Sequence, residues 1–172
     1  MGDRRTYAFE GTTPTIDDEA SVSRESTLIG DVSVGANASV WPGVVLRGDV
    51  GPVIVGQESH VGDNATVHAS TIGQRVMLGH GAVLNEATIE NATLIGFNAT
   101  VNTGVTVGEG SIVASGTVVG ENHEIPSDSF VRGVPAEVTP LAETGVDAEA
   151  IFEEYASGEY TGLAGRHDEL FE

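Results

Sequence analysis

The sequence predicts a mainly β fold in which short parallel strands wind into a three-sided coil. An aliphatic residue returns about every six residues, seventeen times along the chain. Glycine follows it directly at nine of these seventeen sites. The interruptions of the period all fall at one corner of the expected coil. A six-residue period fits neither a helix, with 3.6 residues per turn, nor a hairpin meander, and it is typical of a solenoid of short strands and tight turns.

The recurring aliphatic residues mark the expected interior. They are Ile29, Val34, Val40, Leu46, Val55, Val61, Val67, Ile72, Leu78, Leu84, Ile89, Ile95, Val101, Val107, Val113, Val119 and Ile125. From Ile89 to Ile125 the spacing is six without exception. The strands of an antiparallel sandwich come at roughly 8–12-residue spacing with variable loops, so a sandwich is disfavoured.

Four irregular intervals give the number of sides. Three are five residues long and one is nine: Ile29–Val34, Val67–Ile72 and Leu84–Ile89, and Leu46–Val55. With three sides per turn, all four fall at the same corner, whereas two or four sides would scatter them. We therefore expect about eighteen residues per coil, a coil spacing of ~4.8 Å, and glycine at corners where the backbone turns tightly or takes a positive φ.

This period divides the chain into three parts. Residues 1–28 are expected to lead into the coil, residues 29–136 to form it, and residues 137–172 to provide a linker, a helix and a tail.

The C-terminal part predicts a short amphipathic helix that packs outside the coil. Asp147 can cap the helix, and Ile151, Phe152 and Tyr155 form an apolar stripe. The final residues, HDELFE, are expected to be ordered only by a neighbouring subunit or not at all.

The charge of the chain is strongly one-sided. Asp and Glu number 26 against seven Arg and no Lys, which gives a net charge of −19. Binding to nucleic acid or to an anionic membrane requires cations, so both are disfavoured. The composition is that expected of a halophilic protein, adapted to a cytosol at molar salt, where screening shrinks to ~3 Å.

Other sequence features favour a cytoplasmic protein. There is no cysteine, which excludes disulfides and thiolate chemistry and leaves His, Asp and Glu for any metal. There is no run of 18 apolar residues, as a membrane helix needs, and the first residues lack the apolar core of a signal peptide.

Positions at which a polar residue replaces the glycine after the aliphatic residue indicate where functional side chains lie. On one side of the coil, the residues that follow the aliphatic positions are Arg47, His68, Asn85 and Asn102, which we expect to stack as a polar ladder. Asn tolerates the left-handed conformation, so a hydrogen-bonded Asn ladder on a turn is an alternative to ligation for Asn85 and Asn102. For Arg47 the alternative to a substrate role is an ion pair at a subunit interface.

The next side of the coil carries a second pair. Asp63 and His80 lie 17 residues apart, which is one coil, and an Asp beside a His can fix the tautomer of the imidazole. His68 and His80 lie on different corners of the prism, separated by several residues at ~3.3 Å each. A metal shared by both would therefore require two subunits, and cyclic symmetry would close them into a ring. Solvated or interface-packed histidines are the alternative.

Most of the chain resembles a known family. The segments SVWPGVVLRGDVGPVIVG, HVGDNATVH and VMLGHGAVLNEATI, and the closing EIPSDSFVRGVPAEV, are similar to those of the gamma-class carbonic anhydrases, which are hexapeptide-repeat proteins. The resemblance covers roughly residues 7 to 141. It implies a left-handed parallel β-helix, a homotrimer, and zinc (or iron or cobalt) at each interface, where carbon dioxide is reversibly hydrated to bicarbonate.

The resemblance also implies roles for individual residues. His68 and His80 match two of the three metal-binding histidines, and Asn85 aligns with the third. A metal lowers the pKa of bound water to ~7, Arg47 would favour the bicarbonate product, and Asp63 or Glu86 would export the proton. An amide oxygen is a weak ligand for zinc, so Asn85 is the important departure.

Two further departures affect the supporting residues. Gly62 aligns with a family Gln that orients the metal-bound water, and His60 aligns with a family Asn. His60 is the nearest spare imidazole, although it lies on a different column from Asn85.

Three functions are therefore compatible with the sequence. The first is a carbonic anhydrase or a close metal-dependent variant. The second is a trimeric homologue without that activity, with a structural or small-ligand-binding role. The third is a hexapeptide acyltransferase, which is disfavoured because the chain has no long inserted loop and few cations for the phosphates of coenzyme A.

Overall fold

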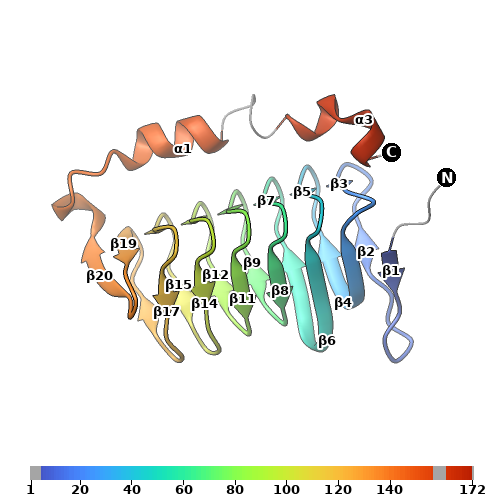
Figure 1. Cartoon of the computed structure of the whole chain (residues 1–172), viewed down its shortest axis with the longest axis horizontal. Coiled ribbons are helices and arrows are strands. Elements are labelled where there is room, and N and C mark those ends of the chain that lie inside the picture. The colour runs from blue at the N-terminus through green and yellow to red at the C-terminus, as the bar shows by residue number, and fades with distance from the viewer. Residues whose placement is uncertain (1–4, 157–161, 172) are drawn as a thin grey trace.

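The protein is a parallel β-solenoid of about seven turns with a helical C-terminal segment along one side (Figure 1). A computed structural model describes residues 5–156 and 162–171 of the 172-residue chain. The mainly β, three-sided coil expected from the six-residue period is confirmed. No helix among these residues is long and apolar enough to cross a membrane.

Each turn contributes one strand to each of three faces. The first face carries β3 (Ser21–Val22), β5 (Ser39–Val40), β7 (His60–Val61), β10 (Met77–Leu78), β13 (Leu94–Ile95), β16 (Ile112–Val113) and β19 (Ser129–Arg132). The second face carries β1 (Arg5–Tyr7), the first parts of β4 (Thr27–Val34) and β6 (Val45–Val55), and then β8 (Thr66–His68), β11 (Val83–Asn85), β14 (Thr100–Val101) and β17 (Val118–Val119). The third face carries β2 (Thr15–Ile16), the later parts of β4 and β6, and then β9 (Thr71–Ile72), β12 (Thr88–Ile89), β15 (Thr106–Val107) and β18 (Glu124–Ile125).

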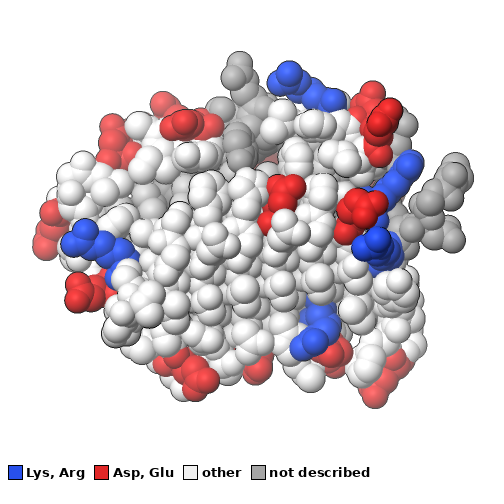
Figure 2. Space-filling view, in the orientation of Figure 1, with Lys and Arg blue, Asp and Glu red and all other residues white. Residues whose placement is uncertain are grey.

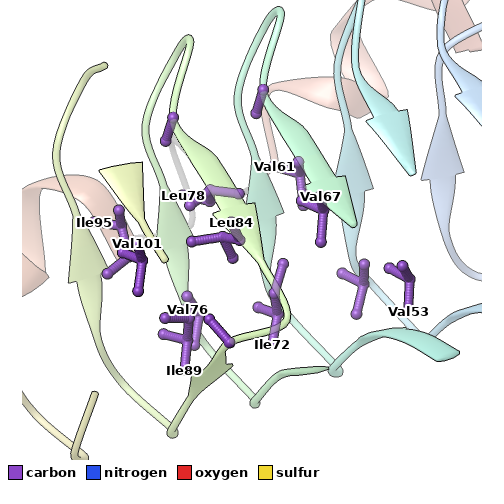
Figure 3. Close-up of a cluster of buried hydrophobic side chains, with 14 of the residues drawn as sticks. Val53, Val61, Val67, Ile72, Val76, Leu78, Leu84, Ile89, Ile95 and Val101 are labelled. Carbon is purple, nitrogen blue, oxygen red and sulfur yellow. The ribbon is translucent and has the colours of Figure 1, made fainter. Parts of the chain in front are cut away.

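The aliphatic residues of successive coils stack on one another inside the prism. Leu46 pairs with Val67, Val67 with Leu84, and Leu84 with Val101, all in parallel register and all fully buried. Figure 3 shows such columns meeting at the centre of the coil. Each of these side chains contributes about 1.5–3 kcal/mol by leaving water. The uniform columns therefore hold the corners, which carry the polar residues, in fixed register.

The inward-facing residue of β4 on the second face is Leu28, and the expectation of Ile29 was wrong. Leu28 is 1% exposed and pairs with Leu46, whereas Ile29 is half-buried and pairs with Arg47. The interval from Leu28 to Val34 is then a regular six residues. Three irregular intervals remain, and all of them fall at the corner between the second and third faces.

The C-terminal segment runs back along the first face (Figure 1). It begins with β20 (Glu137–Pro140), which is antiparallel to β19, and continues through the 3-10 turn η1 (Leu141–Glu143), α1 (Ala148–Ala156), the 3-10 turn η2 (Ala164–Arg166) and α3 (Asp168–Phe171). The expected amphipathic helix is confirmed, and the backbone N–H of Ala150 donates to Oδ1 of Asp147, which caps α1, at 3.0 Å.

Residues 167–171 pack against their own chain, contrary to the expectation for HDELFE, whose last residue, Glu172, lies outside the described residues. The ring of Phe171 meets Trp41 edge-on with centroids 5.2 Å apart, and His167 does the same at 5.8 Å. The backbone N–H of Arg24 donates to the carbonyl oxygen of Leu170 at 3.1 Å. The sequence interpretation missed this contact because its partner, Trp41, lies more than 100 residues earlier in the chain.

Candidate functional site

The second face is bordered by two corners that carry the candidate residues. The His68 corner, toward the third face, holds Arg47, Asp49, His68 and Asn85. The His80 corner, toward the first face, holds Asp63, His80 and Phe97. Between the two corners the outward residues from β4 to β17 are uncharged, and Arg5 of β1 begins the column at the edge of the face: Thr27, Val45, Thr66, Val83, Thr100 and Val118 follow it. Figure 2 shows a broad area without acidic or basic side chains, with the charges gathered along its edges.

The His68 corner holds its imidazole in contact with neighbours from both adjoining coils. Arg47, His68 and Asn85 lie one above another on β6, β8 and β11. Nδ1 of His68 lies 2.8 Å from Oδ1 of Asn85. Nε2 of His68 lies 2.8 Å from Oδ1 of Asp49 and 3.2 Å from Nη2 of Arg47. Both ring nitrogens of His68 therefore have hydrogen-bond partners in the same chain.

The amide of Asn85 extends this column by one coil. Nδ2 of Asn85 donates to Oγ1 of Thr103 at 2.8 Å and lies 3.5 Å from Oε1 of Glu86. These contacts place the amide oxygen of Asn85 toward His68. Asn85 is thus a hydrogen-bonded link between His68 and Thr103, whereas Nδ2 of Asn102, the last member of the expected ladder, donates to the carbonyl oxygen of Val119 at 2.8 Å.

Asp49 supplies the negative charge of the His68 corner. Its Oδ2 atom lies 3.3 Å from Nε of Arg47, and the backbone N–H of Val50 donates to its Oδ1 atom at 2.9 Å. The pKa of Asp49 lies below its ordinary value, mainly because His68 donates a hydrogen bond to the carboxylate. Partial desolvation acts in the opposite direction, while Val50 and Arg47 add to the lowering. An ionised Asp49 therefore offsets the charge of Arg47.

The His80 corner binds its imidazole through one nitrogen only. Nδ1 of His80 lies 2.8 Å from Oδ2 of Asp63 and 3.0 Å from the backbone N–H of Asp63. The carboxylate accepts from a protonated Nδ1, and the amide donates to a bare one, so Asp63 can hold either tautomer. Among the described residues, Nε2 of His80 has no hydrogen-bond partner. The side chain of His80 is 45% exposed.

Two neighbours fix the plane of the His80 ring. Phe97, one coil further on, stacks on it with centroids 5.1 Å apart and 13° between the planes. A Cβ atom at Gly62 would lie only 2.9 Å from Nδ1 of His80. It would lie equally close to the backbone N of His80 and the carbonyl oxygen of Leu78, so the Gln that the family resemblance places at position 62 would require both the ring and the backbone to move.

His60 lies on the first face beneath the C-terminal segment and belongs to neither corner. Its Nδ1 atom is 3.1 Å from Oγ of Ser39, which also accepts a hydrogen bond from Nε1 of Trp41 at 3.2 Å. Burial lowers the pKa of His60 to about 4, the nearby His80 adds to the lowering, and Asp63 opposes it. His60 is therefore neutral at neutral pH, and its position on the first face gives it no place beside Asn85.

Comparison with known proteins agrees with this architecture. The family described as bacterial transferase hexapeptide (six repeats) matches residues 86–121. The carnitine operon protein CaiE of Escherichia coli K12 is 33% identical over 165 residues, which cover 93% of this chain and 83% of CaiE. The chain belongs to the hexapeptide-repeat family. Within it, gamma carbonic anhydrase 1 of Arabidopsis thaliana, a mitochondrial protein, is 38% identical over 90% of this chain.

The similarities differ in how much of each relative they cover. This hexapeptide-repeat chain spans 59% of the length of the Arabidopsis gamma carbonic anhydrase. The crystal structure of a hexapeptide transferase family protein from Anaplasma phagocytophilum superimposes with a TM-score of 0.88, at 29% identity, over 95% of this chain and 98% of the other. The proteins similar in sequence are thus named as gamma carbonic anhydrase and CaiE. The similar crystal structure bears a hexapeptide transferase family title.

The residues of the two corners do not fit the zinc ion that such a family member would use. Within the described residues, no group of three His, Cys, Asp or Glu side chains could hold a metal. Both nitrogens of His68 are hydrogen-bonded, and Asn85 offers only an amide oxygen. Even with the partner's His80, the set would be two imidazoles and an amide, whereas catalytic zinc takes three imidazole, thiolate or carboxylate ligands.

The structure brings some of the predicted residues together and separates others. Arg47, His68 and Asn85 meet at one corner, Asp63 and His80 at the other, and Glu86 follows Asn85 with a positive φ of 49°. The role of Asp49 as a hydrogen-bond partner of His68 was missed. The signal for this role was the nine-residue interval after Leu46. This long interval gives β6 an irregular corner, at which Asp49 lies beside His68.

Proposed function

We propose that this gamma-carbonic-anhydrase-like protein is a trimeric assembly or small-ligand-binding subunit that does not hydrate carbon dioxide with a resident zinc. The observation that carries the proposal is Asn85 at the position of a third imidazole. Its amide oxygen faces His68, and its amide nitrogen donates to Thr103. Both ring nitrogens of His68 and both polar atoms of the Asn85 amide already have partners within the chain.

The uncharged second face supports a trimer. A chain with a net charge of −19 that keeps most of one face, apart from Arg5 at its edge, free of charge has a surface suited to burial against a copy of itself. Three copies with their second faces toward a common axis would bring the His68 corner of each against the partner's His80. The ligand-binding role would use this boundary between subunits.

Metal content and hydration activity test the proposal directly. The protein would be purified in molar salt, loaded with excess zinc, dialysed, and measured by elemental analysis and stopped-flow carbon dioxide hydration. We expect well below one zinc per subunit and no rate above buffer, with a trimeric mass by light scattering. One tightly held zinc per subunit, together with hydration that a chelator abolishes, would overturn the proposal.

Metal-dependent hydration of carbon dioxide is the second candidate, and the His80 corner favours it. Asp63 binds Nδ1 of His80 and leaves Nε2 exposed, which is the arrangement of many metal-binding histidines. Arg47, Asp63 and Glu86 would then serve the reaction, with zinc, iron or cobalt as the metal. The same measurements decide between the two candidates, because only this one requires stoichiometric metal.

The setting proposed for either function is a cytoplasm at molar salt. The absence of Lys and the excess of 26 acidic over seven basic residues support this setting. An acyl-transfer function is disfavoured by the same composition, since coenzyme A phosphates need cations.

A further inference from the structure

A groove lies between α1 and the first face, and two residues of the His80 corner, His80 and Phe97, belong to its lining. Its volume is about 290 Å³. One wall is made by Met77, Leu94 and Ile112 of β10, β13 and β16, and the other by Ile151 and Tyr155 of α1. Ligand pockets typically enclose about 300–1,000 Å³ and are mostly apolar. The groove is therefore the size of a small ligand with an apolar body.

The charges around the groove select the kind of ligand. Glu154 of α1 lines it, and no Arg is among the described residues that do so. The stacked pair of His80 and Phe97 also lines the groove, and Asp63 contacts Nδ1 of His80 without itself lining the groove. An anion would meet the carboxylate of Glu154 here, and no Arg, so anionic ligands are disfavoured.

The aromatic rings add a positive preference for a cation. The faces of Phe97 and Tyr155 carry the negative side of the ring quadrupole, which attracts an ammonium group within about 6 Å. Glu154 has about four lone-pair sites on its carboxylate, so an existing contact leaves room for a further hydrogen bond. We propose that the groove under α1 binds small organic amines, with the apolar body against Leu94 and Ile112 and the ammonium group near Glu154.

The proposal is tested with three probes of the same shape and different charge. Cyclohexylmethylamine, cyclohexylmethanol and cyclohexanecarboxylate would be titrated into the full-length protein in molar salt, with binding followed by methyl NMR. We expect the amine to bind about three- to tenfold more tightly than the alcohol, since cation–π contacts and exposed ion pairs are each modest. The carboxylate should bind most weakly, and NOEs should connect the amine's ring to the methyl groups of Ile112 and Ile151.

Matched variants locate the site. Ala114→Phe, which fills the groove, should abolish amine binding, while Thr88→Phe on the third face should not. Glu154→Gln should remove the preference for amine over alcohol, and Glu153→Gln, which does not line the groove, should retain it. The proposal is overturned if no probe binds, if the carboxylate binds as tightly as the amine, or if NOEs place the amine elsewhere. The NOE measurement on the unmodified protein remains decisive even if Ala114→Phe does not fold, and none of these results depends on zinc.

Discussion

The two corners of the second face treat an imidazole in opposite ways. At the His68 corner the ring sits inside a column, with Asn85 on one nitrogen and Asp49 and Arg47 on the other. At the His80 corner only one nitrogen is held, by Asp63, and the ring remains 45% exposed. One chain therefore contains a histidine with its hydrogen-bonding capacity used and a histidine with half of it available.

This difference arises from a single register position. Residues that follow an inward aliphatic residue stack directly on their equivalents in the next coil, so an Asn one coil above His68 necessarily meets its ring. At the His80 corner the equivalent neighbour is Phe97, which stacks on the ring face and leaves its edge exposed. The residue one coil away thus decides whether an imidazole is structural or available to a ligand.

Removal of salt is expected to have the largest effect on the assembly and stability of the protein. Both corners would be affected, because both are proposed to border a subunit interface. A net charge of −19 repels itself strongly once screening is lost. We predict loss of the trimer, or of the fold itself, on transfer from molar KCl to dilute buffer, followed by light scattering and circular dichroism. A melting temperature indifferent to KCl would contradict the expected adaptation to salt.

Asn85→His should make the His68 corner available to metal. The new imidazole would replace the amide that faces His68 and complete a set of three with the partner's His80. We predict zinc binding at least about 100-fold tighter than in the unmodified protein, since even indirect changes shift metal affinity by about 10–100-fold.

Asn102→His provides the matched control for that variant. It adds an imidazole to the same column but two coils from His68, which is about 9.6 Å. No gain in zinc by elemental analysis is expected for it. Equal gains in the two variants would show that register is not what limits metal binding.

The titration of His60 should have the next largest effect, which is on the pH dependence of stability. His60 is buried, unlike His68 and His80 at the two corners. Its pKa is about 4 in the folded protein against an ordinary value of about 6.5 in the unfolded chain. As the pH falls, the unfolded chain therefore binds a proton at this position before the folded protein does. The free energy of unfolding should decrease by about 3 kcal/mol between pH 6.5 and pH 4.

Denaturant unfolding of the protein and of His60→Gln across this range would measure that loss. The His60→Gln variant has no imidazole at this position to titrate. Its free energy of unfolding should therefore decrease by about 3 kcal/mol less than that of the unmodified protein over this pH range. Parallel curves for the two proteins would mean that His60 is protonated without penalty, contrary to its burial beneath Trp41.

Asp63→Asn should have the smallest effect on stability. The ion pair with His80 is substantially exposed, so its loss should change the free energy of unfolding by less than about 1 kcal/mol. The expected change is in the nitrogen chemical shifts of His80, because a neutral amide replaces the carboxylate that lies 2.8 Å from Nδ1. Asp49→Asn should leave the contact of His68 with Asn85 in place, and a shift of His80 in that variant would indicate coupling between the corners.

The repeat made most of the fold predictable. Inward residues such as Leu46 and Leu84 follow from the period alone, because each occupies the same place in an 18-residue coil. The mistake at Ile29 arose where two adjacent residues, Leu28 and Ile29, were both aliphatic and only pairing with Leu46 could choose between them. The pairing of Asp63 with His80 was predictable for the same reason as the core, since one coil separates them.

Contacts that depend on departures from the repeat were not predicted. Asp49 reaches His68 because β6 is extended by an irregular corner whose path the period does not describe. The contact of Phe171 with Trp41 joins segments with no shared register at all. In both cases the geometry of a non-repeating segment decides which side chains meet.

The return of the C-terminal segment to the first coil has a consequence for how the molecule opens. Stacked repeats usually unravel from their ends, since a terminal repeat has only one neighbour. Here the chain leaves the last coil at β20 and ends on Trp41 and Arg24, near the start of the stack (Figure 1). Release of the contact of α3 with Trp41 would therefore free both ends together, so hydrogen exchange at the first and last coils should rise in concert when that contact is removed.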